Sequence, residues 1–176
     1  VSTGSDDAEE SASGSVGLTS SDLELVRTSS NQQIGMRFNN ISIEQGAIIN
    51  SAYIEFACDE NWHTEATNLT IYGQAHNNAL TFSVFSNNIS HRVKTNASVA
   101  WNITDQWATV HEIHQSPDLA PIIQEIVDRS GWESGNAMVI IITGTGKRVA
   151  ESWNGANSSG DLTLAPRLVI DFTGGS

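Results

Sequence analysis

Residues 34–56 read IGMRFNNISIEQGAIINSAYIEF, and this stretch decides the fold class. Apolar residues alternate with polar ones in short runs, first at Ile34, Met36 and Phe38 and again at Ala52, Ile54 and Phe56. Because side chains on a strand point alternately to opposite faces, each run predicts a strand with one buried and one exposed face. Similar runs recur in residues 138–152 and 164–172. Several such strands separated by Gly and Asn turns predict an all-β fold, an antiparallel β-sandwich of the jelly-roll type.

One segment carries helical signals instead. Ser116 or Asp118 is expected to cap the helix, Pro121 falls in its first turn, and Gly131 follows its end. Five apolar residues recur at helical spacing and form one face: Leu119, Ile122, Ile123, Ile126 and Val127. The sequence therefore predicts one short α-helix around residues 118–130.

The chain length of 176 residues fits a single domain. Residues 1–4 are expected to be a flexible leader, residues 5–173 the β-sandwich, and residues 174–176 a linker remnant of a larger multidomain protein. The acidic segments near residues 5–10 and 21–26 are separated by about the length of a hairpin loop, so they are expected to form a first pair of neighbouring strands.

The net charge of −12, with Lys94 and Lys147 as the only lysines, disfavours some partners. Nucleic acid and anionic membranes would repel such a surface. No apolar run approaches the roughly 18 residues of a membrane span, so membrane insertion is not expected. The single cysteine, Cys58, excludes an internal disulfide and is expected to be a small buried hydrophobic residue.

Acidic residues near the amino terminus are the first candidate site. On strands, Asp7 and Glu9 point to one side, as do Asp22 and Glu24, and Asp171 joins them if the terminal strands lie side by side. Calcium suits such a group because Ca²⁺ takes six to eight oxygen ligands in flexible geometry. The predicted role is structural, since the ion would hold the amino terminus to the sheet. The alternative interpretation is a solvated acidic face without any ion.

Tryptophans provide the second candidate site. Trp101, Trp107 and Trp132 are assigned to the core, whereas Trp62 and Trp153 lie where a loop or strand end can expose them. Exposed indole rings stack on the apolar faces of sugars and anchor many interfaces. The predicted ligand-binding residues are Trp62 and Trp153, with Glu151 and Asn154 as polar neighbours. The alternative is that both rings form a lid over the core.

Motifs for catalysis are missing. There is no G-x-S-x-G elbow, and residues 144–147 lack the remaining residues of a phosphate-binding loop. His111 and His114 have a spacing that can bind a metal, but no third ligand is obvious, so loop histidines are the favoured interpretation. We therefore expect a protein that is not an enzyme.

The order of these elements resembles the DNRLRE-type, carbohydrate-binding-module-like β-sandwiches of secreted bacterial proteins. The resemblance covers about residues 5–172, and it is carried by residues 34–38, 46–56, 98–101, 118–132, 138–143 and 165–170. It implies a noncatalytic jelly roll appended to polysaccharide-degrading or surface proteins, some members of which bind acidic glycans. The chain lacks the motif that gives the group its name and has a longer acidic segment at residues 6–10. No binding residue of the group is therefore carried over, and a sheet face or the loops at one end remain equal candidates.

The resulting hypothesis is a monomeric, extracellular or cell-surface β-sandwich, stabilised by calcium, that binds a polysaccharide or oligosaccharide without cleaving it. The alternative function is a structural or adhesive spacer domain of a surface protein.

Overall fold

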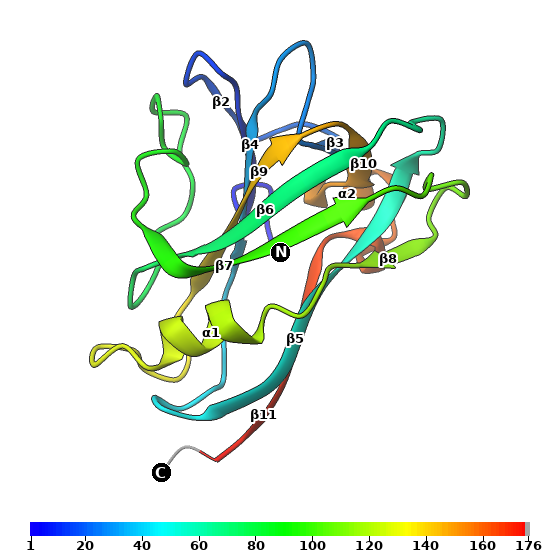
Figure 1. Cartoon of the computed structure of the whole chain (residues 1–176). Helices are drawn as coiled ribbons and strands as arrows, with labels where there is room; N and C mark the ends of the chain where they lie inside the picture. Colours follow the sequence, from blue (N-terminus) through cyan, green and yellow to red (C-terminus); the bar gives the residue numbers. More distant parts are fainter. Residues whose placement is uncertain (175–176) are drawn as a thin grey trace.

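The structure, a computed structural model, describes residues 1–174 and consists of two antiparallel β-sheets packed face to face (Figure 1). The first sheet has six strands in the order β2-β1-β4-β9-β6-β7. Its strands are β1 (Asp7–Glu10), β2 (Val16–Gly17), β4 (Gln33–Phe38), β6 (Thr67–Gln74), β7 (Lys94–Ile103) and β9 (Met138–Thr145). The second sheet has the order β11-β5-β10-β3, with β8 also paired to β5. Its strands are β3 (Asp22–Leu25), β5 (Ile48–Glu60), β8 (Ile113–Gln115), β10 (Arg148–Glu151) and β11 (Arg167–Thr173). The predicted all-β sandwich is confirmed.

The alternation that predicted the strands also builds the core. Ile34 and Met36 of β4 are fully buried, as are Ile54 and Phe56 of β5, and they pack together between the sheets. Strand β9 is buried on both faces, because a second apolar cluster covers its outer side. That cluster contains Ala8, Val16, Ala79, Phe82, Ile89, Val139 and Ile141, contributed in part by the 75–93 loop. Trp101, Trp107 and Trp132 are core residues as predicted.

The chain crosses repeatedly between the sheets, so neighbours within a sheet are often distant in sequence. Strand β4 pairs with β9, and β5 pairs with both β10 and β11. β10 pairs with β5 at Cys58 and Glu60, and β11 continues in the same direction from Glu55 to Ile48. The segment 152–166 is therefore an insertion between two strands that follow one another along β5.

This insertion contains a helix that the sequence analysis missed. Helix α2 (Trp153–Ser159) starts where Ser152 Oγ accepts a hydrogen bond from the Gly155 N–H at 3.0 Å, and it ends at Gly160 in the left-handed conformation. A short 3₁₀ turn, η1 (Leu162–Leu164), follows. The prediction of a single helix, with Trp153 at the end of a strand, was wrong because a serine cap was not recognised.

The predicted helix is present but shorter. Helix α1 (Ala120–Val127) packs its apolar face, including Ile122 and Ile126, against the core. Asp118 Oδ1 accepts hydrogen bonds from Ala120 N–H at 3.0 Å and from Ala52 N–H at 2.9 Å, so it ties the helix start to β5. Among residues 1–174, no helix is long and apolar enough to cross a membrane.

The amino-terminal residues lie against the domain instead of extending from it as a flexible leader. The amino group of Val1 donates a hydrogen bond to Pro166 O at 2.7 Å, and Ser2 Oγ donates to Asp6 Oδ2 at 2.8 Å. At the other end, residues 175–176 of the expected linker remnant lie outside the described residues.

Candidate functional site

The two acidic strands near the amino terminus lie in different sheets. Strand β1 pairs with β2 and β4, whereas β3 pairs with β10. The prediction that β1 and β3 are paired neighbours was therefore wrong, because the chain crosses to the opposite sheet between them. The two strands nevertheless approach where the sheets meet, since Glu24 N–H donates to Glu9 Oε1 at 2.9 Å. Gln32 Nε2 donates to the same oxygen at 2.8 Å and so fills part of the space where a cation would sit.

The five predicted calcium ligands do not form one group. Asp7 is buried and accepts a hydrogen bond from Trp153 N–H at 2.7 Å. Asp171 is exposed on β11, where it pairs with Ser51 of β5, whereas β3 pairs with β10. The prediction that Asp171 joins the others was wrong, because the terminal strands are in different sheets. Of the predicted ligands, Glu9 and Glu24 lie together and Asp22 belongs to another cluster.

That second cluster, which we call the carboxylate cluster, consists of Asp22, Asp59 and Glu60. One carboxylate oxygen of each residue lies within 4.8 Å of those of the other two. Asp22 begins β3, whereas Asp59 and Glu60 end β5, and β10 lies between these strands. The oxygen-only donor set and the half-exposed positions are those that calcium takes in proteins. The cluster therefore joins an edge strand to the centre of its sheet.

Further charges surround the carboxylate cluster. Glu151 is directly opposite Asp22 in the β10–β3 register and is only 6% exposed. Its Oε1 lies 3.2 Å from His111 Nε2. Lys147 Nζ lies 3.7 Å from Glu24 Oε1 and 3.8 Å from Glu60 Oε2. Carboxylates thus outnumber cationic groups on this outer face of the five-stranded sheet.

Burial, together with the excess of negative charge, raises the pKa of three of these carboxyl groups. Burial raises the pKa of Glu151, and the charge of Asp59 raises it further. Burial also raises the pKa of Asp59, with the charge of Asp22 as the next cause. Burial raises the pKa of Glu9 above its usual range, and the neighbouring charge of Glu24 adds to the increase. Like charges that are held together in this way favour a bound cation, which relieves their repulsion.

Trp62 lies in the loop that follows the carboxylate cluster and is 63% exposed. His63 Nε2 lies 2.7 Å from Glu60 Oε2, and the His63 ring is tilted against the Trp62 indole with 5.5 Å between centroids. Asn61 is bonded to the neighbouring loop through its side chain, which donates to Ala108 O at 3.2 Å. The loop that carries the exposed indole is therefore held on both sides of the ring.

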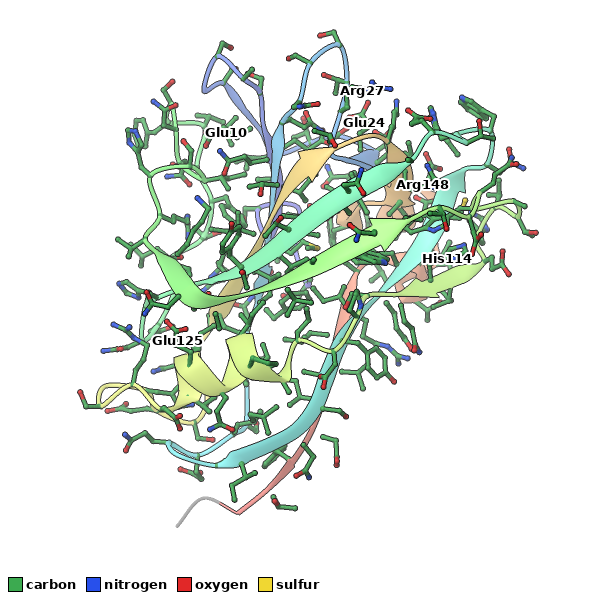
Figure 2. All side chains as sticks on the ribbon, in the orientation of Figure 1. Glu10, Glu24, Arg27, His114, Glu125 and Arg148 are labelled. Atoms are coloured by element: carbon green, nitrogen blue, oxygen red, sulfur yellow. The ribbon has the colours of Figure 1, made fainter. Side chains whose placement is uncertain are left out.

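A buried arginine fixes the same end of the sandwich. Arg148 is fully buried, and Figure 2 shows it beside the β10 end of the molecule. Its guanidinium donates to Asp105 O at 2.9 Å, to Glu65 O at 2.9 Å and to Thr67 Oγ1 at 3.1 Å. Among residues 1–174 its hydrogen bonds go to main-chain carbonyls and to the Thr67 hydroxyl, and none goes to a carboxylate. These bonds join the 61–66 loop and the 104–112 loop to β10.

The other predicted ligand-binding residues lie elsewhere. Trp153 is half-buried and packs against a small cluster of Ala57, Ala156, Leu164 and Ala165. Its ring is therefore not a free platform. Asn154 follows it in α2 near Gly4, and Glu151 lies beneath Gly155. The structure thus brings Glu151 to the carboxylate cluster but does not bring Trp153 and Asn154 to Trp62.

A groove of about 710 Å³ opens on another part of the surface, between the 162–168 segment and residues 38–41. Its wall includes Glu55 and Arg167, which form an ion pair of 2.6 Å, together with His111 and Ile113. Among its described lining residues there is no Trp or Tyr, and the ring of Phe38 is buried. The groove therefore lacks a surface on which a sugar ring could stack.

Asp59 and Glu60 were missed as site residues, and His111 was considered with His114 but interpreted as a loop histidine. Asp59 and Glu60 end the longest strand, and only Asn61 separates them from Trp62, so this closeness in sequence was the available signal. His111 approaches Glu151 across 40 residues of sequence, which no local pattern could indicate.

No protein-family model matches the chain, and no curated protein matches it.

Proposed function

We propose that this chain is a noncatalytic carbohydrate-binding module of a secreted or cell-surface protein, stabilised by calcium. The observation that carries the proposal is the exposed indole of Trp62 on a loop that is fixed by hydrogen bonds on both sides. A large apolar ring in water is favourable to cover, and sugars present apolar faces of matching size. Because the loop is already ordered, little conformational entropy is lost when a ligand binds.

The polar surroundings of Trp62 suit hydroxyl groups. Glu60 and His63 lie next to the ring in sequence and are linked to one another. Gln106 donates through Nε2 to Asn61 O, which brings a further amide to the same loop. Amide, imidazole and carboxylate groups can exchange hydrogen bonds with sugar hydroxyls. The ligand predicted from these contacts is a polysaccharide or oligosaccharide.

Calcium is proposed at the carboxylate cluster of Asp22, Asp59 and Glu60, with main-chain oxygens and water completing its coordination. The ion would link β3 to the end of β5, directly before the Trp62 loop. The proposed role of the ion is therefore structural: it would stabilise the geometry of the loop that carries Trp62.

A glycan array tests the function. The chain in calcium is applied to immobilised neutral and acidic polysaccharides, in parallel with a Trp62→Ala variant and a Trp153→Ala variant. We expect binding by the natural chain that is lost in Trp62→Ala. The Trp153 variant controls for removal of an indole that packs onto the protein, provided that its melting curve shows it folded. Silence of the natural chain across the array would reject sugar binding and leave the structural or adhesive spacer as the function.

A further inference from the structure

A second surface has the properties of a carbohydrate-binding face. The outer face of the six-stranded sheet is divided into two parts. The 75–93 loop covers β1, β4 and the start of β9, where Phe82 and Ile89 are buried beneath it. Strands β6 and β7 and the end of β9 are left open, and β6 and β7 lie at the front in Figure 1.

The open part is a regular array of polar side chains. Three rows run across the strands: Thr145, Asn68 and Asn102; Thr143, Thr70 and Ala100; and Ile141, Tyr72 and Ser98. Among these, Ile141 alone is covered by the 75–93 loop, and the others are exposed or half-exposed. We call these eight exposed or half-exposed residues the amide-hydroxyl face.

The amide-hydroxyl face carries no charged side chain among its described residues, although the chain as a whole has a net charge of −12. Charged residues lie at its borders. Lys94 pairs with Gln74 at one end. Glu125 of α1, which Figure 2 labels beside β7, accepts hydrogen bonds from Asn96 N–H at 2.8 Å and Ala97 N–H at 2.7 Å. A charged ligand would find no counter-charge on the face itself, whereas a neutral one would need none.

The polar groups of this face are also free. Thr143 Oγ1 reaches Thr70 O only at 3.5 Å, and the other polar side chains of the face make no hydrogen bond within residues 1–174. Tyr72 is the one aromatic residue in the array and is half-exposed. The face thus combines a ring for stacking with flanking donors and acceptors.

Its length fits an extended polymer. Strand β6 has eight residues, which corresponds to roughly 25 Å at about 3.3 Å per residue. The strand starts at Thr67, immediately after the 61–66 loop that carries Trp62, so the face leads to that loop (Figure 1). A single chain lying along β6 can therefore reach from Tyr72 toward Trp62.

We infer that the amide-hydroxyl face binds an extended neutral polysaccharide, with Tyr72 as its stacking residue. This inference rests on the proposed carbohydrate-binding function and specifies its ligand class as neutral and its surface as the sheet face. It differs from the loop site alone, because it assigns binding to side chains of β6, β7 and β9 in addition to the loop that carries Trp62.

Affinity electrophoresis through gels that contain hydroxyethyl cellulose, xylan, galactomannan or alginate tests the inference. Tyr72→Ala removes the ring, and Ala100→Glu places a charge at an exposed position of the face. Thr173→Glu makes the same change of charge on the other sheet and serves as the control. Melting curves establish that each variant is folded, and light scattering gives its oligomeric state.

We expect a neutral polysaccharide to retard the natural chain and Thr173→Glu equally. Tyr72→Ala should bind about tenfold more weakly, which corresponds to about 1.4 kcal/mol and lies within the range of an aromatic contact, and Ala100→Glu should also lose binding. Neutral-polymer binding that both face variants retain and Trp62→Ala abolishes would overturn the inference while the proposed function stands. Binding to alginate only would also overturn it. Absence of any binding would overturn both proposals. A dimer that Ala100→Glu converts to a monomer would identify the face as a contact between copies and reject the inference.

Discussion

Asp6 and Asp7 are adjacent, and both are buried, with exposed fractions of 1% and 3%. Their environments nevertheless differ. Asp6 pairs with Arg37 Nη1 at 3.1 Å and also accepts hydrogen bonds from Ser2 and Asn39, and these contacts hold its pKa below the usual value despite the opposing effect of burial. Asp7 accepts its side-chain hydrogen bond from Trp153 N–H, and burial raises its pKa from 3.8 to about 6.

The two residues should therefore respond oppositely to replacement by asparagine. One pKa unit corresponds to about 1.4 kcal/mol, so ionised Asp7 destabilises the folded state by about 3 kcal/mol at neutral pH. Below about pH 4 Asp7 is protonated in both the folded and the unfolded state, so the folded state does not carry this penalty. The corresponding stability is lost as the pH rises through about 6, where Asp7 ionises in the folded state. Asp7→Asn removes the loss and can still accept the Trp153 hydrogen bond. Asp6→Asn instead weakens charge-assisted bonds and should lower stability by about 2 kcal/mol.

Urea unfolding in the presence of a chelator, at several values between pH 4 and 7.5, measures both effects. We expect the free energy of unfolding of Asp7→Asn to match that of the natural chain near pH 4 and to exceed it by up to about 3 kcal/mol at pH 7.5. Asp6→Asn should be less stable throughout the neutral range. A difference between Asp7→Asn and the natural chain that does not change with pH, or a loss of stability at pH 7.5, would refute the reasoning. Repeating the series in calcium tests the original assignment of Asp7 as a ligand, since a ligand would make the substitution destabilising only when the ion is present.

Three further predictions concern the site and its support. Calcium at 100 times its dissociation constant should stabilise the natural chain by about 2.7 kcal/mol, which raises the melting temperature by roughly 5–10 °C. Asp22→Asn should abolish this increase, and the control Asp171→Asn should retain it. A melting temperature that does not change when calcium is chelated would reject the ion. Arg148→Met should cost at least about 3 kcal/mol in urea unfolding, because it removes a buried side chain and leaves the partly buried carbonyl oxygens of Glu65 and Asp105 without donors, and a loss below about 1 kcal/mol would contradict this role. Ser152→Ala should cost about 1 kcal/mol through loss of the α2 cap, measured in the same way, and no loss would show that the cap is dispensable.

The fold was predictable because alternation in single strands is local information. In β4 and β5 the alternate apolar positions that the sequence pattern indicates are buried. The pairing of β1 with β4 and of β3 with β10 was not predictable, since it depends on which sheet the chain enters after each turn. For the same reason the predicted calcium ligands do not lie together, and Asp22 lies close to Asp59 instead of Asp7.

Exposure was predicted correctly for Trp62 and wrongly for Trp153. A loop tryptophan next to polar residues usually lies outside the core, and Trp62 does. Trp153 is in the same kind of sequence, but Ser152 starts a helix that turns its ring onto Ala57 and its neighbours. The amide-hydroxyl face left no sequence signal, because its rows form only when β6, β7 and β9 pair in their specific register.

Fluorescence titration of the intact chain tests the central claim most directly. Trp101, Trp107 and Trp132 are buried and Trp153 is half-buried, so a change in the emission of a solvent-exposed indole reports on Trp62. We predict that a bound polysaccharide shifts the emission to shorter wavelength in a saturable manner and that Trp62→Ala shows no such shift. A polysaccharide that binds with the same affinity to Trp62→Ala, or a spectrum unchanged at every concentration of every glycan, would contradict the assignment of this exposed ring as the anchor for sugar.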